Sequence, residues 1–198
     1  MRIRTVFRST MLRAVEYALF SAGFLLLGYC AYTLLDAHLY QQHERQAFEQ
    51  ITRSAPARIP VRAALVARHS VLGEIEIPRV GMSAMIAEGD DQRTLKRAVG
   101  HVPGTALPGD RGNVVLAAHR DTLFRSLRKI HEGDVIRVAT WTGSYRYRVK
   151  SIRVVAPRDL GVLAPTDEPT LTLVTCYPFY FVGPAPKRFV VRAGLVSG

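Results

Sequence analysis

The chain has 198 residues, of which 48% are apolar, and it carries 27 Lys and Arg against 16 Asp and Glu, a formal net charge of +11. This length allows one ordinary domain with appendages, and the apolar content excludes a chain that is disordered throughout. Residues 71–198 hold 18 of the basic and 12 of the acidic residues, so the charge is spread along the chain. Such a spread is typical of a solvated surface and would also favour an anionic membrane or wall polymer. The sequence has no zinc-finger spacing, and we predict no nucleic-acid partner.

The first distinct feature is an uncharged apolar segment, Tyr17–Leu35, whose 19 residues are close to the ~20 that a helix needs to cross a bilayer. Four arginines precede this segment and no acidic residue stands before Glu16, which predicts a cytoplasmic N-terminus and an extracytoplasmic remainder. The alternative is a cleavable signal peptide, but its apolar core spans only ~7–15 residues, and Asp36–Leu39 lacks a small-residue cleavage pattern. We therefore expect an uncleaved single-pass membrane anchor, in which Cys30 is a packing or lipid-facing residue.

Residues 36–70 have the composition of a stalk or linker. Leu39–Ile51 contains good helix formers and is expected to extend the anchor helix above the membrane, until Pro56 and Pro60 interrupt it. The predicted organisation is a basic cytoplasmic tail at 1–16, an anchor at 17–35, a stalk or linker at 36–70 and a folded domain at 71–198.

From Val71 onward the pattern is that of short β-strands. Leu72–Ile77 alternates apolar and acidic residues, as a half-buried strand should, and Pro78 ends it. Asp90–Val99 is predicted to be a short helix, with Asp at its start and basic residues later. The other expected strands are Gly81–Ala87, Asn113–Ala118, Asp134–Thr140, Tyr145–Val155, Leu171–Cys176 and Phe189–Leu195, with Trp141–Ser144 as a hairpin turn. Seven or eight short strands with little helix predict a mainly β fold, a closed or nearly closed barrel.

The strongest candidate for chemistry is Cys176, at the end of the predicted strand Leu171–Cys176. A turn-rich loop follows, and Arg188 then leads the next strand, so antiparallel pairing of the two strands would place Arg188 beside the thiol. A thiol in an electropositive setting suits nucleophilic attack on an acyl carbon, and a guanidinium can oppose the oxyanion that develops. The alternative is that Cys176 is a small buried hydrophobe, the commoner fate of a free cysteine.

His119 is the candidate base because it directly follows the predicted strand Asn113–Ala118 and so also stands at a strand end. A surface histidine in a loop is the alternative. His38, His43 and His69 fall in the stalk, and His101 and His131 fall in turn-like contexts, so His119 is preferred by its setting.

Three features together resemble the sortase family: Val115–Asp121 as VLAAHRD, Thr172–Cys176 as TLVTC, and Arg188 twelve residues after the cysteine. The similarity is to the single-domain enzymes called class D, covers roughly residues 71–196, and places the histidine 57 residues before the cysteine. Many members have Gly where this chain has Ala118, a difference that matters only where the backbone requires a positive φ.

The resemblance implies an eight-stranded sortase-like β-barrel with short helices after an N-terminal transmembrane helix, in a bacterial cytoplasmic membrane. It implies a cysteine transpeptidase that cleaves an LPxTG-like sorting signal near the C-terminus of a secreted protein and transfers the acyl group to an amine on wall material or another protein. Cys176 would be the nucleophile, His119 the acid and base, Arg188 the oxyanion partner, and Thr175 would add oxyanion or substrate contacts. No metal or other cofactor is expected.

Two other functions stay open at this point. One is a peptidoglycan-acting cysteine enzyme such as an L,D-transpeptidase, although those enzymes place His and Cys in one short motif. The other is a non-catalytic surface module on a barrel scaffold. The four aromatic residues between the cysteine and the arginine (Tyr177, Phe179, Tyr180 and Phe181) are expected either to line a substrate groove or to pack on the barrel.

Overall fold

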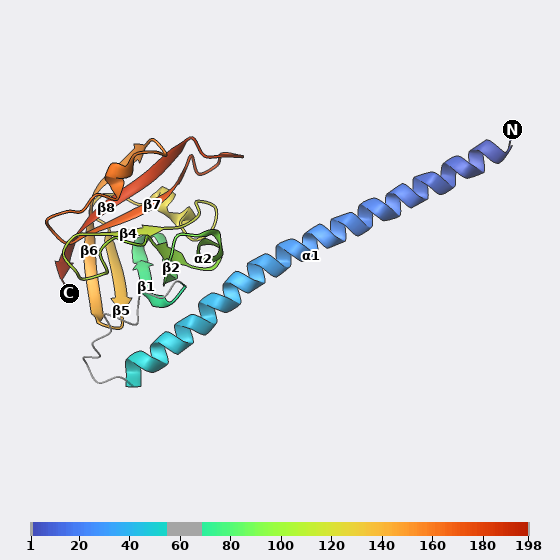
Figure 1. The fold of residues 1–198 in the computed structure, drawn as a ribbon. Helices are drawn as coiled ribbons and strands as arrows, with labels where there is room; N and C mark the ends of the chain where they lie inside the picture. Colours follow the sequence, from blue (N-terminus) through green and yellow to red (C-terminus); the bar gives the residue numbers. More distant parts are fainter. Residues whose placement is uncertain (1, 55–68, 198) are drawn as a thin grey trace. The chain divides into compact units, whose positions relative to one another are not determined.

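The structure, a computed structural model, describes residues 2–54 and 69–197 (Figure 1). Contacts divide the chain into two compact units, residues 1–39 and residues 40–198. Residues 55–68 of the predicted stalk or linker lie outside the described residues.

The N-terminal element is a single long helix, α1 (Arg2–Ser54). Within it, Arg13–Gln50 contains an apolar window long enough to cross a membrane, and none of that window is buried inside the protein. The expected continuation of the anchor helix through Leu39–Ile51 is confirmed, since α1 is unbroken there. By length and composition, this helix therefore fits a membrane anchor.

The last part of α1 packs against the barrel and belongs to the same compact unit. The side-chain amide of Gln41 makes two hydrogen bonds to the backbone of the barrel unit. It donates to the Arg97 carbonyl (2.6 Å) and accepts from the Met85 N–H (2.8 Å). Phe48 is only 5% exposed, and its ring centroid lies 4.4 Å from that of Trp141. The stretch of α1 from Gln41 to Phe48 thus packs on the barrel, whereas the domain boundaries at residues 16, 35 and 70 remain predictions.

Eight strands form a closed barrel in the order β1-β2-β3-β4-β7-β8-β6-β5. Only two neighbouring pairs are parallel, β2 with β3 and β4 with β7. The helical turns η1 (Pro78–Val80), η2 (Arg125–Lys129) and η3 (Leu160–Val162) lie in the connections, and α2 (Gln92–Arg97) links β2 to β3. The strands are β1 (Val71–Ile77), β2 (Met82–Glu88), β3 (Val99–His101), β4 (Asn113–Ala117), β5 (Val135–Thr140), β6 (Gly143–Val155), β7 (Thr170–Tyr177) and β8 (Lys187–Ser197).

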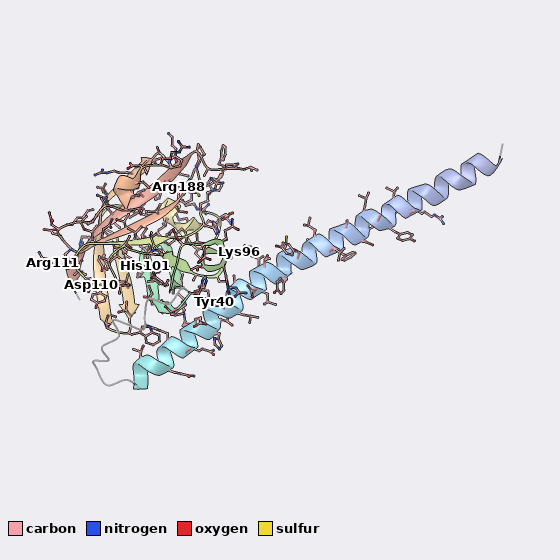
Figure 2. The ribbon with its side chains drawn as sticks, in the orientation of Figure 1. Tyr40, Lys96, His101, Asp110, Arg111 and Arg188 are labelled. Carbon is pink, nitrogen blue, oxygen red and sulfur yellow. The ribbon has the colours of Figure 1, made fainter. Side chains whose placement is uncertain are left out.

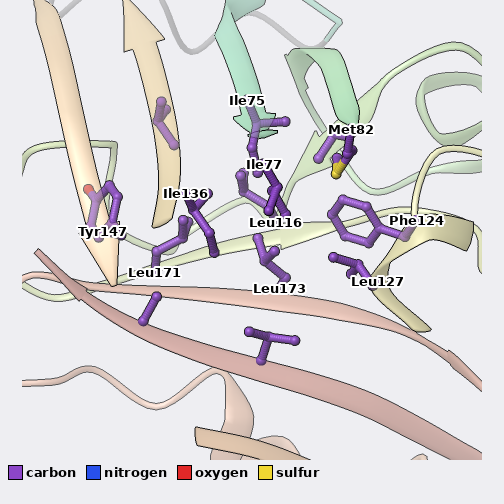
Figure 3. Packing of buried hydrophobic residues seen from close by; sticks show 14 of the residues in the cluster. Ile75, Ile77, Met82, Leu116, Phe124, Leu127, Ile136, Tyr147, Leu171 and Leu173 are labelled. Atoms are coloured by element: carbon purple, nitrogen blue, oxygen red, sulfur yellow. The ribbon is translucent and has the colours of Figure 1, made fainter. Parts of the chain in front are cut away.

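The barrel interior holds one apolar cluster to which both the first and the last strands contribute (Figure 3). Its fully buried members include Ile75 and Ile77 from β1, Leu116 from β4, and Leu171 and Leu173 from β7. Alternate residues of each strand point inward, which is why β1 shows the expected alternation of apolar and acidic side chains. Consecutive residues are buried in Asn113–Leu116 of β4 and Leu171–Leu173 of β7, as is usual for parallel neighbours covered on both faces, whereas the end of β7 is partly exposed.

The sequence prediction of the strands is confirmed except at β3. Asp90–Val99 was expected to be one helix, but α2 ends at Arg97 and β3 begins at Val99. Val-Gly-His shows no alternation, and a Cβ at Gly100 would approach the Gly89 carbonyl oxygen to 2.3 Å, so glycine permits this close strand approach.

The assignment of His101 to a turn is accordingly wrong, since His101 ends β3 and is only 2% exposed (Figure 2). Its Nδ1 lies 2.6 Å from Glu88 Oε2, and its Nε2 lies 2.9 Å from the Ala106 carbonyl oxygen. Both ring nitrogens thus have partners inside the fold, which is what permits a polar side chain to be buried there.

A partly buried ion pair joins Arg79 of η1 to Asp134, the residue before β5. Arg79 donates to both carboxylate oxygens of Asp134, which also accepts from the His131 N–H at 2.7 Å. The hydrogen bonds from Arg79 are the main reason that the pKa of Asp134 lies below its usual range, with the backbone bond from His131 acting in the same direction.

We predict that Asp134→Asn lowers the stability of the protein by about 1–2 kcal/mol at neutral pH, because a charge-assisted hydrogen-bond acceptor is lost. For a protein of this size, that corresponds to a fall of about 2–8 °C in the unfolding midpoint. Since the folded-state pKa is depressed, the contribution of Asp134 is fully present above the unfolded pKa of ~3.9 and disappears as the pH falls through the folded-state pKa.

The measurement is thermal unfolding followed by fluorescence of Trp141, the single tryptophan, between pH 7 and pH 2. Glu132→Gln is the control because Glu132 is exposed and lies two residues away. If the unfolding midpoints of Asp134→Asn and the native chain differed by the same amount at every pH down to 2, the depressed pKa of Asp134 would not be the source of the stabilisation.

Candidate active site

The predicted catalytic residues belong to three segments that end or begin neighbouring strands, β4, β7 and β8. These strands lie side by side in the barrel (Figure 1). β4 runs parallel to β7, and β8 runs antiparallel to β7. The carboxyl ends of β4 and β7 and the amino end of β8 therefore lie at the same end of the barrel. His119 follows β4, Cys176 lies near the end of β7, and Arg188 lies at the start of β8.

Cys176 and Arg188 are direct cross-strand partners in the β7–β8 pair. Residues directly opposite each other in an antiparallel pair project to the same face, with Cβ atoms ~4.5–5.5 Å apart. Both side chains are partly exposed, so the sulfur is not sealed in the interior. The expected approach of Arg188 to the thiol is present at the level of strand register.

His119 is held beside the cysteine strand by backbone contacts that continue past the end of β4. The register pairs Ala117 with Val174, and the Ala118 N–H donates to the Val174 carbonyl at 3.4 Å. If this register is continued for two residues, His119 comes opposite Cys176. Ala118 is not one of the described residues with positive φ, so the backbone there does not require the glycine that many sortases have.

Thr175 connects the cysteine strand to the histidine segment. Its hydroxyl donates to the Ala118 carbonyl at 2.7 Å, and the residue is only 3% exposed. Because side chains alternate along a strand, Thr175 faces the opposite side from Cys176. This hydrogen bond thus links Ala118, the residue before His119, to Thr175, the residue before Cys176.

Arg188 lies at the start of β8, directly after the loop that separates it from Cys176. One of its terminal nitrogens donates to the carbonyls of Ala185 (3.3 Å) and Lys187 (3.1 Å). In the described part of the chain, no carboxylate forms a salt bridge with Arg188, and its other terminal nitrogen makes no hydrogen bond. The guanidinium can therefore offer donors to a carbonyl or an oxyanion.

Arg120 is a residue of this region that the sequence did not single out. Its guanidinium donates to three carbonyls of the β7–β8 loop, those of Pro178 (3.0 Å), Phe181 (2.7 Å) and Gly183 (3.1 Å). It also lies 5.9 Å from the centroid of the Phe181 ring. The residue directly after His119 thus ties down the loop that directly follows the Cys176 strand.

The loop aromatics divide between the two alternatives that the sequence left open. Phe179 packs on the core, with its ring centroid 5.2 Å from that of Phe189, and Tyr177 stacks on the same ring at 6.1 Å. Tyr180 and Phe181 instead are 76% and 44% exposed and stand at the tip of the loop. Two aromatics are therefore barrel packing, and two are available to a ligand.

Within residues 2–54 and 69–197, no group of three His, Cys, Asp or Glu side chains is close enough to hold a metal ion. His131 is exposed in the turn before β5, as its turn-like context suggested.

Comparison with known proteins identifies the family. The family model for the sortase domain matches residues 75–196, which is more than half of the chain. Sortase D of Bacillus subtilis (strain 168) is 35% identical over 126 residues, which are 63% of this chain and 64% of that protein. The chain thus spans slightly less than two thirds of that relative's length.

The solved structures agree. A sortase D5 transpeptidase of Clostridium perfringens superposes with a TM-score of 0.66 at 28% identity, covering 81% of this chain and 98% of that one. A Clostridium perfringens sortase C, solved with the C-terminal cell wall sorting motif, superposes with a TM-score of 0.62 at 30% identity, covering 77% and 85%. Most of the barrel lies in the matched region, as do Cys176, His119 and Arg188, and the chain therefore belongs to the sortase family.

Proposed function

We propose that this protein is a membrane-anchored cysteine transpeptidase that uses Cys176, His119 and Arg188. The observation that carries the proposal is the strand register, which pairs Cys176 with Arg188 and leads the peptide before His119 alongside β7. Family membership alone gives a reaction class, and this register supports our proposal that these three side chains carry the roles.

The proposed reaction has two halves. The Cys176 sulfur attacks the carbonyl carbon of the scissile amide, and the oxyanion that forms accepts hydrogen bonds from Arg188. His119 gives a proton to the leaving nitrogen as the C–N bond breaks, which leaves a thioester on Cys176. An acceptor amine then loses a proton to His119, attacks the thioester carbon and expels the thiolate, so that one amide replaces another.

We propose a positioning role for Thr175, because its hydroxyl is already donated to the Ala118 carbonyl. This role differs from the oxyanion or substrate contact expected from the sequence resemblance, which stays a prediction. As a positioning residue, Thr175 would keep the imidazole and the thiol at a fixed separation.

For the substrate, we propose a secreted protein with an LPxTG-like sorting signal near its C-terminus. A related sortase C has been solved with the C-terminal cell wall sorting motif, and its fold overlays most of this chain. The acceptor would be an amine on wall material or on another protein. The alternatives, an L,D-transpeptidase-like enzyme and a non-catalytic module, make different predictions in the experiments below.

We predict that Cys176→Ala abolishes acyl transfer, by about 1,000-fold or more, while the unfolding midpoint changes by only a few degrees. The assay follows cleavage of a fluorescent LPxTG peptide library by the full chain in detergent, with hydroxylamine as the acceptor. His119→Ala should cost a similar factor, and Arg188→Lys about 100-fold, because a lysine cannot reproduce the planar donors of arginine. Thr175→Val should lower turnover but leave a measurable rate.

Intact mass spectrometry of the trapped thioester separates the alternatives. A sorting peptide on Cys176 supports the proposal, whereas an adduct with the mass of a peptidoglycan stem peptide indicates the L,D-transpeptidase-like function. Turnover retained in Cys176→Ala would refute the cysteine mechanism. No turnover in the native chain, with a thiol no more reactive than that of a free peptide, would indicate the non-catalytic module.

We predict that Arg120→Lys speeds amide hydrogen exchange in residues 179–183 by about 10-fold, because losing two of the three carbonyl contacts removes ~1–2 kcal/mol of local stabilisation. If the loop binds substrate, KM for the peptide should rise more than kcat falls. Arg111→Lys is the matched control, since Arg111 is an exposed arginine in the turn before β4. Unchanged exchange in Arg120→Lys would show that the three hydrogen bonds do not hold the loop.

We propose that the anchor is single-pass, with the N-terminus inside and the barrel on the outer side of the cytoplasmic membrane. The support is the basic stretch before Tyr17 and the long apolar helix.

The two cysteines of the chain provide the test of this topology. In spheroplasts, a membrane-impermeant maleimide should label the native chain but not Cys176→Ser, whose remaining Cys30 lies in the proposed span. Labelling of Cys176 that begins only after permeabilisation would place the barrel in the cytoplasm.

A further inference from the structure

A pocket of about 310 Å³ lies between the η1–β2 turn and the segment that follows His119. Val80–Met82 form one side of it, and the other side comes from Thr122, Leu123 and four residues of η2. The pocket is separate from the strand ends that carry Cys176 and Arg188, and none of the proposed catalytic residues lines it.

The walls of this pocket carry three positive charges. Arg125, Arg128 and Lys129 all line it, and all three are exposed. In the described part of the chain, none of the three forms a salt bridge with a carboxylate. The neighbouring Arg79 differs, because its guanidinium pairs with Asp134 and also donates to the Lys129 carbonyl. Three gathered cations without counter-charges repel one another and favour a bound anion.

A second, independent feature of the pocket is Ser126. It lines the same cavity, yet its hydroxyl oxygen is shielded from solvent and is the one buried side-chain polar atom of the described residues without a hydrogen-bond partner. A buried hydroxyl without a partner is destabilising, and native structures contain few of them. Because the oxygen is shielded, an oxygen of a ligand seated in the pocket would supply the missing partner only after the Ser126 side chain rotates toward the pocket.

The pocket adjoins the candidate active site through two contacts. The turn that supplies Thr122 is closed by the hydrogen bond from the Phe124 N–H to the His119 carbonyl at 3.1 Å. Arg128 donates to the Tyr180 hydroxyl and lies 5.4 Å from the centroid of that ring, so η2 also contacts the β7–β8 loop. A ligand in the pocket would thus lie against the segments that position both His119 and the loop.

We propose that this pocket is an anion site that binds a phosphate group, as a phosphate ester or a diphosphate. Phosphate matches the charge and the donors of the walls, because its oxygens accept hydrogen bonds from guanidinium, ammonium and hydroxyl groups alike. The site is proposed independently of the transpeptidase reaction, since no catalytic residue takes part in it. The same chemistry is offered by a soluble phosphate ester and by the headgroup of an anionic phospholipid.

The experiment uses the full chain in nanodiscs made only of phosphatidylcholine, titrated with inorganic pyrophosphate, with thermal unfolding as the readout. We expect a concentration-dependent rise of the unfolding midpoint, as follows when a ligand binds only the folded state. The double variant Arg125→Gln with Lys129→Gln should weaken the apparent affinity at least 10-fold. Its matched control is Arg146→Gln with Arg148→Gln, which removes the same charge from exposed positions of β6.

Ser126→Ala supplies a test in which two effects have opposite signs. Without pyrophosphate, the variant should unfold at a higher temperature than the native chain, because the unpartnered hydroxyl is gone. With pyrophosphate, its midpoint should rise less than that of the native chain. A merely structural serine would not change the response to the ligand.

Two further arms complete the design. Cys176→Ala should bind pyrophosphate like the native chain, so a failed transpeptidase assay and a failed anion site are distinguishable. Nanodiscs containing phosphatidylglycerol reveal the lipid source if they reduce the pyrophosphate response of the native chain but not of the Arg125 and Lys129 double variant. Equal responses of the pocket and control double variants, in both kinds of nanodisc, would overturn the proposal.

Discussion

The pairing of β7 with its two neighbours is the constraint on which the candidate active site depends. In a sheet, hydrogen bonds allow a strand to shift only in discrete steps, and a shift of one residue would turn Cys176 to the opposite face. The antiparallel register with β8 sets Arg188 opposite the thiol, and the parallel register with β4 sets the height of His119. The core residues Leu171 and Leu173 hold this register, because a slip of one residue would remove both side chains from the apolar cluster of the barrel interior.

Two side chains extend this control beyond the strands, into segments where no ladder of hydrogen bonds exists. The Thr175 hydroxyl holds the Ala118 carbonyl, and the Arg120 guanidinium holds three carbonyls of the β7–β8 loop. Thr175 reaches from the cysteine strand to the residue before His119, and Arg120 reaches from the residue after His119 to the loop that follows the cysteine strand. The backbone before and after His119 is therefore attached to the cysteine strand and to its loop, which under the proposed mechanism would hold the imidazole and the thiol at a fixed separation.

Much of this arrangement is predictable from the sequence, since strand ends, the cysteine and the arginine follow from local patterns. The unpredicted parts depend on partners that no local pattern identifies. β3 has three residues without alternation, and its His101 is buried only because Glu88 and the Ala106 carbonyl meet its two ring nitrogens. Arg120 bonds backbone carbonyls, which every residue has, so its sequence neighbours give no sign of its role. Likewise, the packing of Phe48 against Trp141 joins residues far apart in the chain.

The β7–β8 loop combines a fixed base with an exposed tip, and this division bears on how specificity arises. Phe179 is packed on the core and Arg120 binds the carbonyls on both sides of the tip, whereas the side chains of Tyr180 and Val182 are 76% and 96% exposed. Ordering a flexible loop on binding costs conformational entropy, and a loop whose backbone is already tied loses less. Under the proposed function, substitutions of the exposed side chains would change the preferred peptide without moving Cys176 or Arg188, because the strand register fixes those two residues independently of the tip.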